Sequence, residues 1–363
     1  MGKISLILPA LLALGLVGCR VPTSISMEGT GGRNSYNMVV QKSNSEELLL
    51  NLVRLRYYDA PLFLELSNIT TQVTYKTTAG TNFSIPGFNH DSPVGFNGEF
   101  SWQDQPTIQY TPLEGQEFAA QMMKPIELST IQLLVYSGWD VDRLFRLVIQ
   151  SFANQLNMPL SGAPAPVHEP HYKSFFVAIK LLRELQLQGH LLTGVKITED
   201  EHGRKESLQI GFPKDNEVSQ KLAALLPTVT DFDRKYVLSM LKGFTPEGKI
   251  GVMSRSLLSC MYYVSLGVEV PKVDIENGAI AMPEGWSETS GEWNKVAKEL
   301  LTVQTCDQMP SHASVAVKYR GHWFYIADND LNSKRTFALL MQLFNLQAVE
   351  QKLPPPILTL PLG

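Results

Sequence analysis

The sequence lacks the short motifs that mark most nucleophile, zinc and nucleotide enzymes. It contains no Gly-x-Ser-x-Gly segment, no His-Glu-x-x-His segment and no phosphate-binding loop. An envelope hydrolase whose catalytic residues are dispersed along the chain stays an alternative, with His312 or His322 as its base. We therefore assign no catalytic residue, expect no cofactor and no bound metal ion, and favour a non-enzymatic role.

Charged residues are few, and basic ones are not in excess. Charged side chains make up 18% of the chain, and the formal net charge is −4. This balance excludes a generally basic protein that binds nucleic acid. Hydrophobic residues make up 44%, which is typical of a globular chain and excludes a mainly disordered one.

The apolar stretch near the N-terminus, Ile4–Leu14, is shorter than the roughly 20 residues that a permanent membrane-spanning helix needs. It follows Lys3 and precedes Leu16-Val17-Gly18-Cys19, a pattern typical of a signal peptide that ends in a lipobox. We predict that residues 1–18 are removed and that Cys19 carries diacylglycerol and fatty acid, palmitate included. Removal of Lys3 makes the formal net charge of −4 more negative by one unit.

The lipid on Cys19 is predicted to hold the mature protein on a membrane without spanning it. Each buried methylene contributes about 0.8 kcal/mol, so two or three acyl chains form an essentially permanent anchor. Arg20 stands where inner-membrane lipoproteins of enteric bacteria carry an aspartate. We expect the outer membrane, on its periplasmic or its surface face, with the membrane and other envelope proteins as partners. An oligomer stays open.

Cysteine is scarce, with three in the whole chain. Lipid on Cys19 leaves Cys260 and Cys306, an even pair in an oxidising compartment. A disulfide between them could add roughly 4 kcal/mol of stability on the chain-entropy argument. The alternative is a buried free thiol at Cys260, because this residue lies in an apolar helical run.

The domain organisation follows from composition and from turn residues. Residues 20 to 42 mix glycine with serine and threonine, which is typical of a flexible tether. The segment Met158–Pro170 contains four prolines. We predict a signal peptide at 1–18, the lipidated cysteine and tether at 19–42, a strand hairpin with helices at 43–160, a proline-rich linker at 161–170 and an α+β second half at 171–363. The two halves forming one continuous unit is the alternative.

Two segments alternate with the period of a β-strand, Ile69–Tyr75 and Val94–Trp102. Their length and pattern match those of transmembrane β-strands, so each subunit of an oligomeric export or pore complex could donate a hairpin at 69–103. A sheet face packed against helices gives the same alternation. The candidate membrane or interface residues are Val73, Tyr75, Phe96, Phe100 and Trp102.

The remaining periodicity predicts an α+β fold of antiparallel strands and hairpins packed with amphipathic helices. We expect helices at 43–56 from a Ser43 cap, 114–123, 128–137, 141–156 capped by Asp140, 172–188 ended by Gly189, 253–266, and one after a cap at Asp330 or Ser333. We expect further strands at 107–110, 191–197, 207–212, 315–319 and 322–326.

Two clusters have some of the residues of a metal site. His168-Glu169-Pro170-His171 could place two histidines on one helical turn, but Pro170 interrupts a helix. Asp328, Asp330 and Asn332 have the spacing of the first ligands of a calcium loop, whose glycine and glutamate are missing. We predict a solvated linker for the first and a capped strand-to-helix turn for the second.

Several segments together resemble an uncharacterised family of lipoproteins from Gram-negative bacteria, over essentially the whole mature chain. They are Ser43–Leu66, Tyr110–Phe118, Gly138–Arg146, Lys318–Asp330 and the terminal Leu358–Gly363. The resemblance implies an envelope address and a single fold, and it implies no activity, cofactor or catalytic residue.

Overall fold

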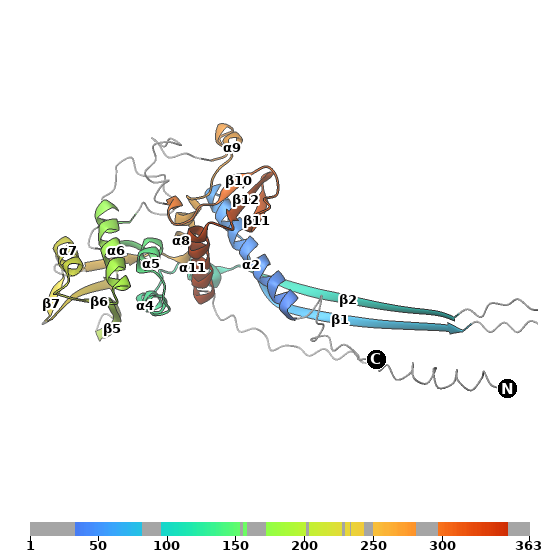
Figure 1. Ribbon diagram of the computed structural model, residues 1–363, viewed down its shortest axis with the longest axis horizontal. Helices are drawn as coiled ribbons and strands as arrows, with labels where there is room; N and C mark the ends of the chain where they lie inside the picture. The colour runs from blue at the N-terminus through green and yellow to red at the C-terminus, as the bar shows by residue number, and fades with distance from the viewer. Residues whose placement is uncertain are drawn as a thin grey trace, which may run out of the picture. The chain divides into compact units, whose positions relative to one another are not determined.

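The computed structural model describes residues 33–81, 96–152, 155–157, 172–200, 203–226, 229–232, 234–242, 250–280 and 297–347 (Figure 1). The chain divides into two compact units, which are described separately. Residues 1–44 and 66–111 form the first unit, and residues 45–65 and 112–363 form the second. Helices and antiparallel strands occur together, so the predicted α+β class is confirmed.

The first unit contains a two-stranded sheet of β1 (Phe63–Thr81) and β2 (Phe96–Leu113), which run side by side as a hairpin (Figure 1). The sequence predicted both strands but made them too short. The separate strand predicted at 107–110 was wrong, because these residues continue β2 past Pro106. A two-stranded sheet tolerates proline, whose missing N–H leaves no ladder bond broken when it faces the free edge.

Helix α2 (Arg33–Arg56) begins in the first unit and ends in the second. The predicted start at Ser43 was wrong, and the helix includes the last part of the predicted tether. Ser43 and Glu46 have capping-box spacing, but Gly31 and Gly32 are the nearest upstream residues that disfavour a helix. A capping motif inside a segment without glycine or proline therefore did not stop the helix from extending upstream.

The second unit is built on a seven-stranded sheet in the order β4-β3-β9-β8-β6-β5, with β7 also paired to β8. The β8–β9 pair is parallel, and the β3–β9, β5–β6 and β6–β8 pairs are antiparallel. The hairpin predicted at 191–197 and 207–212 is confirmed as β5 and β6. The strands are β3 (Ile149–Phe152), β4 (Gln155–Leu156), β5 (Leu192–Asp200), β6 (Gly203–Pro213), β7 (Thr230–Phe232), β8 (Lys235–Lys242) and β9 (Ile250–Ser254).

This sheet joins strands from both sides of the predicted linker at 161–170, which lies outside the described residues. Helices pack around it, and α6 ends as predicted at Gly189, whose φ of 72° suits a helix C-terminus. The helices of this part are α3 (Gln116–Met123), α4 (Leu128–Tyr136), α5 (Val141–Val148), α6 (Tyr172–Leu187), α7 (Glu217–Leu225), α8 (Leu257–Ser265) and α9 (Lys272–Glu276).

Two helix predictions in this region were wrong for one shared reason. The helix predicted at 141–156 ends at Val148, and the chain continues as β3. The helix predicted from Met253 begins at Leu257 instead, after β9 and a Ser256 cap. Strands β3 and β9 pair with each other, with Ile149 opposite Ser254. Pairing between segments about a hundred residues apart therefore overrides the local helical period.

A second, three-stranded sheet has the order β10-β12-β11. The strands predicted at 315–319 and 322–326 are confirmed, and they pair with each other as a hairpin. The hairpin turns at Arg320 and Gly321, with φ angles of 47° and 92°, as a two-residue turn of this hand requires. Asp330 caps the last helix, since its carboxylate accepts the Ser333 N–H at 3.0 Å. The elements are β10 (Gln304–Cys306), β11 (Ala313–Tyr319), β12 (His322–Ala327) and α11 (Leu331–Gln347).

One hydrophobic core connects both sheets of the second unit with the C-terminal half of α2. Among the described residues, no helix combines the length and apolar character needed to cross a bilayer. The largest side chains that are almost fully buried include Leu49, Leu52, Phe145, Phe175, Phe212 and Phe324.

Candidate functional site

The β1–β2 hairpin carries the five predicted interface residues. Val73 and Tyr75 lie on β1, and Phe96, Phe100 and Trp102 lie on β2. That these residues meet a membrane or another protein stays a prediction. Cys19, the predicted lipidation site, lies outside the described residues.

The length of this hairpin exceeds the prediction. Strand β1 has 19 residues and β2 has 18. At about 3.4 Å per residue, each strand reaches about 60 Å, roughly twice the 30 Å of a bilayer's hydrocarbon core. In the part of the chain that the structure describes, this sheet has two strands, so each strand has one edge of unpaired backbone groups. The hairpin can therefore accept further strands along either side.

The first residues of β1 belong to the second unit and are fixed there by specific contacts. The Asn51 side chain bonds Leu62 twice: its Nδ2 donates to Leu62 O at 2.7 Å, and its Oδ1 accepts the Leu62 N–H at 3.0 Å. Phe63 is buried, stacks on Phe344 with ring centroids 5.1 Å apart, and meets the edge of Phe118 at 5.8 Å. We call these contacts of Leu62 and Phe63 within the second unit the root of the hairpin.

A cluster of tyrosine, aspartate and arginine lies beside this root. Tyr57 Oη donates to Asp274 Oδ2 at 2.6 Å, and both side chains are buried. The Arg320 guanidinium lies 5.1 Å from the centroid of the Tyr57 ring, within range for a cation–π contact. Tyr319 Oη donates to Asp59 Oδ2. These contacts, which we call the tyrosine cluster, bind the end of α2 to α9 and to the β11–β12 hairpin.

Burial and the two carboxylates set the ionisation of the tyrosine cluster. Desolvation and the bond to Asp274 raise the pKa of Tyr57 well above its usual range. Desolvation, followed by the bond to Asp59, raises the pKa of Tyr319. Both phenols stay neutral at ordinary pH, so each can keep donating to its carboxylate. The cluster therefore acts as a structural clamp.

Tyr58, like Arg320, has a left-handed backbone, with a φ of 60°. Its side chain is 54% exposed. It stands just after α2, where glycine is usually preferred. The Asp59 N–H donates to Arg54 O at 2.9 Å, and the Tyr58 N–H donates to Leu55 O at 3.2 Å. These hydrogen bonds satisfy carbonyls at the C-terminus of α2.

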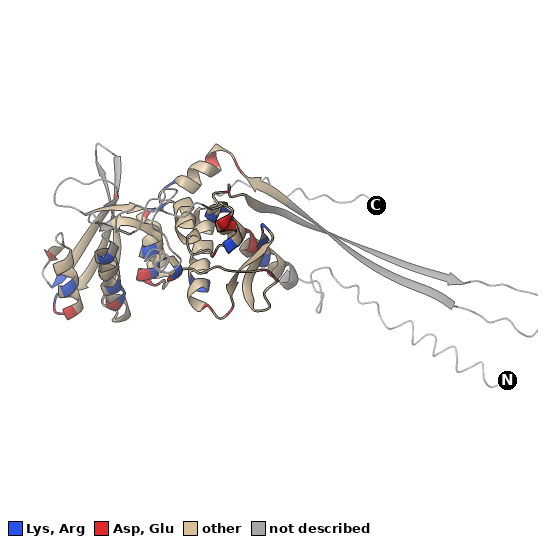
Figure 2. Ribbon diagram, turned by 90° about the horizontal axis from the view of Figure 1, so that it is seen from above, with Lys and Arg blue, Asp and Glu red and all other residues tan. Residues whose placement is uncertain are grey.

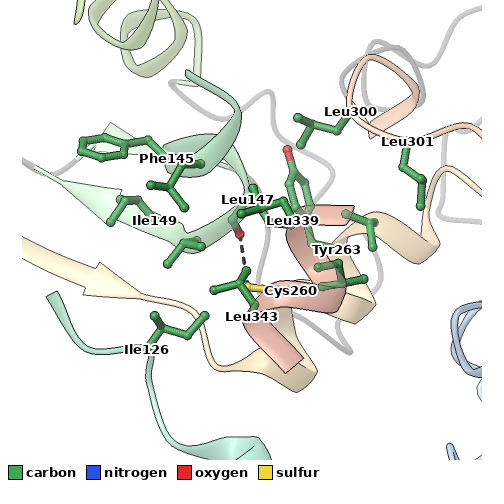
Figure 3. Close-up of a cluster of buried hydrophobic side chains, with 14 of the residues drawn as sticks. Ile126, Phe145, Leu147, Ile149, Cys260, Tyr263, Leu300, Leu301, Leu339 and Leu343 are labelled. Atoms are coloured by element: carbon green, nitrogen blue, oxygen red, sulfur yellow. Dashed lines mark hydrogen bonds between the residues drawn. The ribbon is translucent and has the colours of Figure 1, made fainter. Parts of the chain in front are cut away.

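Cys260 and Cys306 are not joined by a disulfide here, and both are free thiols. Cys260 is fully buried, and its Sγ donates to Leu147 O at 3.4 Å among apolar side chains (Figure 3). Burial raises the pKa of the Cys260 thiol to about 12, which makes it inert at neutral pH. Cys306 Sγ donates to Gln308 O at 3.0 Å on the other sheet.

The structure brings one candidate base together with an acid. His322 Nδ1 lies 2.9 Å from Asp307 Oδ1, because β10 and β12 pair with Cys306 opposite Trp323. The sequence analysis missed this pair, since register decides it. The neighbouring thiol of Cys306 donates to a backbone carbonyl and not to His322. Asp307 therefore orients the His322 ring, and no nucleophile in the described part of the chain is hydrogen-bonded to that ring.

One nucleophile spacing escaped the sequence analysis. Ser239 and Lys242 are three apart, as in serine–lysine enzymes. Both residues lie on strand β8. Ser239 Oγ donates to Gln209 Oε1 at 2.9 Å, so its hydroxyl has a partner within the sheet.

The part of the chain that the structure describes contains no group of three or more metal ligands, and Asp328, Asp330 and Asn332 make other contacts there. Asp328 pairs with Lys334 at 2.6 Å, and Asp330 caps α11. Asn332 Oδ1 accepts from the buried Arg143 at 2.7 Å. The predicted capped turn is confirmed. His168 to His171 lie outside the described residues.

Arg255 is fully buried and holds the end of α5. Its Nη1 donates to the carbonyls of Arg146, Leu147 and Ile149, each at 3.1 Å. Its guanidinium lies 4.2 Å from the centroid of the Tyr263 ring. Burial lowers the pKa of Arg255, yet the carbonyls at a helix C-terminus are a favourable environment for a cation. This cation stabilises the junction where α5 becomes β3.

Charge on the surface is mixed. Acidic and basic residues both occur on several of the described helices (Figure 2). Mixed charge does not favour a polyanionic partner such as nucleic acid.

No family model, no curated protein and no solved structure matches the chain.

Proposed function

We propose that this protein is an outer-membrane lipoprotein, anchored through Cys19, that binds other envelope proteins or takes part in an envelope assembly without catalysing a reaction. The lipobox and the resemblance to an uncharacterised lipoprotein family support the address. The structure supports the binding role through the hairpin, which is the observation that carries the proposal.

The strands of the hairpin are long, with 19 residues in β1 and 18 in β2. It extends about 60 Å, falls mainly in its own compact unit, and presents two open edges. Extended strands with open edges bind other strands through main-chain hydrogen bonds. Among the described residues of the second unit, Arg255 and the tyrosine cluster are engaged in structural bonds. A binding element fits these features better than an active site does.

The predicted lipid anchor and outer-membrane localisation are tested by labelling growing cells with a palmitate analogue and separating their membranes. The wild-type protein should take up label and sediment with the outer membrane, and Cys19→Ser should lose both properties. Equal membrane association of the unlabelled variant would refute the lipid anchor.

The binding role is tested by photocrosslinking in cells. A photoreactive amino acid at Phe100 on β2 should give discrete adducts of higher mass. The same group at Lys318, an exposed position on β11, is the matched control and should give few. Adducts from Lys318 alone would move the binding surface away from the hairpin.

A second candidate function is a subunit of an oligomeric export or pore complex. The observation that favours it is strand length, since about ten residues per strand suffice to cross a bilayer and both strands are longer. The mature protein should then form a large defined oligomer in mild detergent, and a variant lacking residues 79–103 should be monomeric. Folded monomers in both samples would remove this candidate.

A further inference from the structure

Open edges on so long a hairpin need a partner strand. An isolated two-stranded ribbon is at best marginally stable in water, and three or more strands are needed for independent stability. Long exposed edges also promote uncontrolled pairing, which natural proteins avoid by covering or closing them. In the described part of the chain, β1 and β2 have only each other as sheet partners. A further strand on each edge would satisfy both requirements.

We propose that the occupant of these edges is a second copy of this chain, with β2 of one copy pairing antiparallel with β1 of the next, so that the hairpins close into a ring. The inference rests on the proposed function, because it takes the lipid anchor as given. It deepens that function by naming the partner and the strands that meet. A closed ring leaves no open edge.

Strand direction favours this arrangement over its alternatives. Anchors on Cys19 place all copies on one side of a membrane, so neighbouring hairpins share one orientation. Copies related by an axis along the membrane normal then bring the descending β2 beside the ascending β1, which is an antiparallel pair. Antiparallel β1–β1 or β2–β2 pairing instead needs a two-fold axis across the strands, which would direct the two anchors to opposite sides.

The distribution of charge agrees with strand direction. Beyond its first three residues, β1 carries one charged residue, Lys76, whereas β2 carries Glu99 and Asp104. Contact between β2 and the next β1 brings the strand of Glu99 and Asp104 beside the strand that carries Lys76. Contact between two like strands joins charges of one sign, which destabilises a strand pair.

Pro106 limits how far the new pairing extends. In the ring β2 has a neighbour on both sides, and a proline inside a fully paired strand removes a ladder hydrogen bond. The continuous pairing is therefore expected along Phe96–Gln105 and not beyond Pro106. This stretch has the length of a membrane-crossing β-strand, about 9 to 11 residues.

The test uses cysteine crosslinking between two versions of the full-length lipidated protein, both carrying Cys306→Ser. One version has Thr74→Cys on β1, the other has Ser101→Cys on β2, and the two carry different affinity tags. They are co-expressed, extracted in mild detergent and treated with a short bis-maleimide. Each version is also treated alone, and Lys318→Cys in the same background is the control for random collision.

We expect the mixed dimer to exceed either like-with-like dimer at least fivefold, and the Lys318→Cys control to give only background. Dominant like-with-like dimers would overturn β2-to-β1 pairing. A monomer that is labelled with lipid and sediments with the outer membrane would overturn the inference and leave the proposed address intact. Loss of lipid labelling would refute the proposed function itself.

Discussion

Replacing Tyr57 with phenylalanine removes one oxygen from the tyrosine cluster and leaves the ring under Arg320. Tyr57 is 5% exposed and Asp274 is 8% exposed, so water cannot readily replace the lost donor. A hydrogen bond to a charged group contributes about 1.5–3 kcal/mol, and a buried acceptor left without its donor costs a similar amount. We expect Tyr57→Phe to lower the free energy of unfolding by about 2 kcal/mol.

Urea unfolding followed by tryptophan fluorescence measures this change, and Tyr58→Phe is the matched control. The Tyr58 side chain is exposed, so its hydroxyl should contribute less than about 0.5 kcal/mol. A double-mutant cycle with Asp274→Ala should assign most of the loss to the pair. If Tyr57→Phe and Tyr58→Phe cost the same, the tyrosine cluster does not clamp α2.

Four further predictions follow from other sites. Stability should fall as pH rises above about 10, because an unfolded tyrosine ionises near 10 while the pKa of folded Tyr57 is raised, and Tyr57→Phe should flatten that fall in unfolding experiments from pH 8 to 11. Arg255→Met should cost about 3–5 kcal/mol, because it removes three charge-assisted hydrogen bonds from buried carbonyls that then keep their contacts to Asn157 or Cys260, and calorimetry would contradict this if Tm did not drop. In a Cys19→Ser variant, a thiol reagent at pH 8 should modify Cys306 quickly and Cys260 only after unfolding; fast modification of both would contradict the burial of Cys260. Gly267→Ala should be strongly destabilising, since its Cβ would lie 1.9 Å from Leu301 O, and equal stability to wild type would show that this close approach is wrong.

Local signals were enough to predict those elements whose stabilising contacts lie nearby in the chain. The β11–β12 hairpin follows from alternation on both sides of Arg320-Gly321, and α6 ends where Gly189 makes a left-handed backbone possible. The cap of α11 was also correct, because Asp330 and Ser333 are only three residues apart. In each case the deciding bond is short-range.

Distant contacts explain what the sequence could not predict. The apolar periodicity that begins at Val141 continues in the sequence to Leu156, but α5 ends at Val148. The side chains of Arg255 and Asn157 donate to the carbonyls of Arg146 and Ile149 at this helix end. The periodicity itself does not contain that information.

The candidate site shows the same division. Alternation predicted the hairpin, but not its full length. The Tyr57–Asp274 bond joins residues 217 apart, and the His322–Asp307 contact depends on the register of β10 against β12. Neither pair has a spacing from which it could be predicted.

The root of the hairpin also constrains the order in which the chain can fold. Phe63 completes its packing against Phe344, and Tyr57 reaches its acceptor only at Asp274, so early residues depend on late ones. Contacts of such long sequence separation slow folding, because a large loop must close before they stabilise anything. A chain interrupted before Asp274 keeps α2, the root and their apolar side chains without partners. Such intermediates aggregate readily, so growing or truncated chains should depend on a holding chaperone until the C-terminal helix arrives.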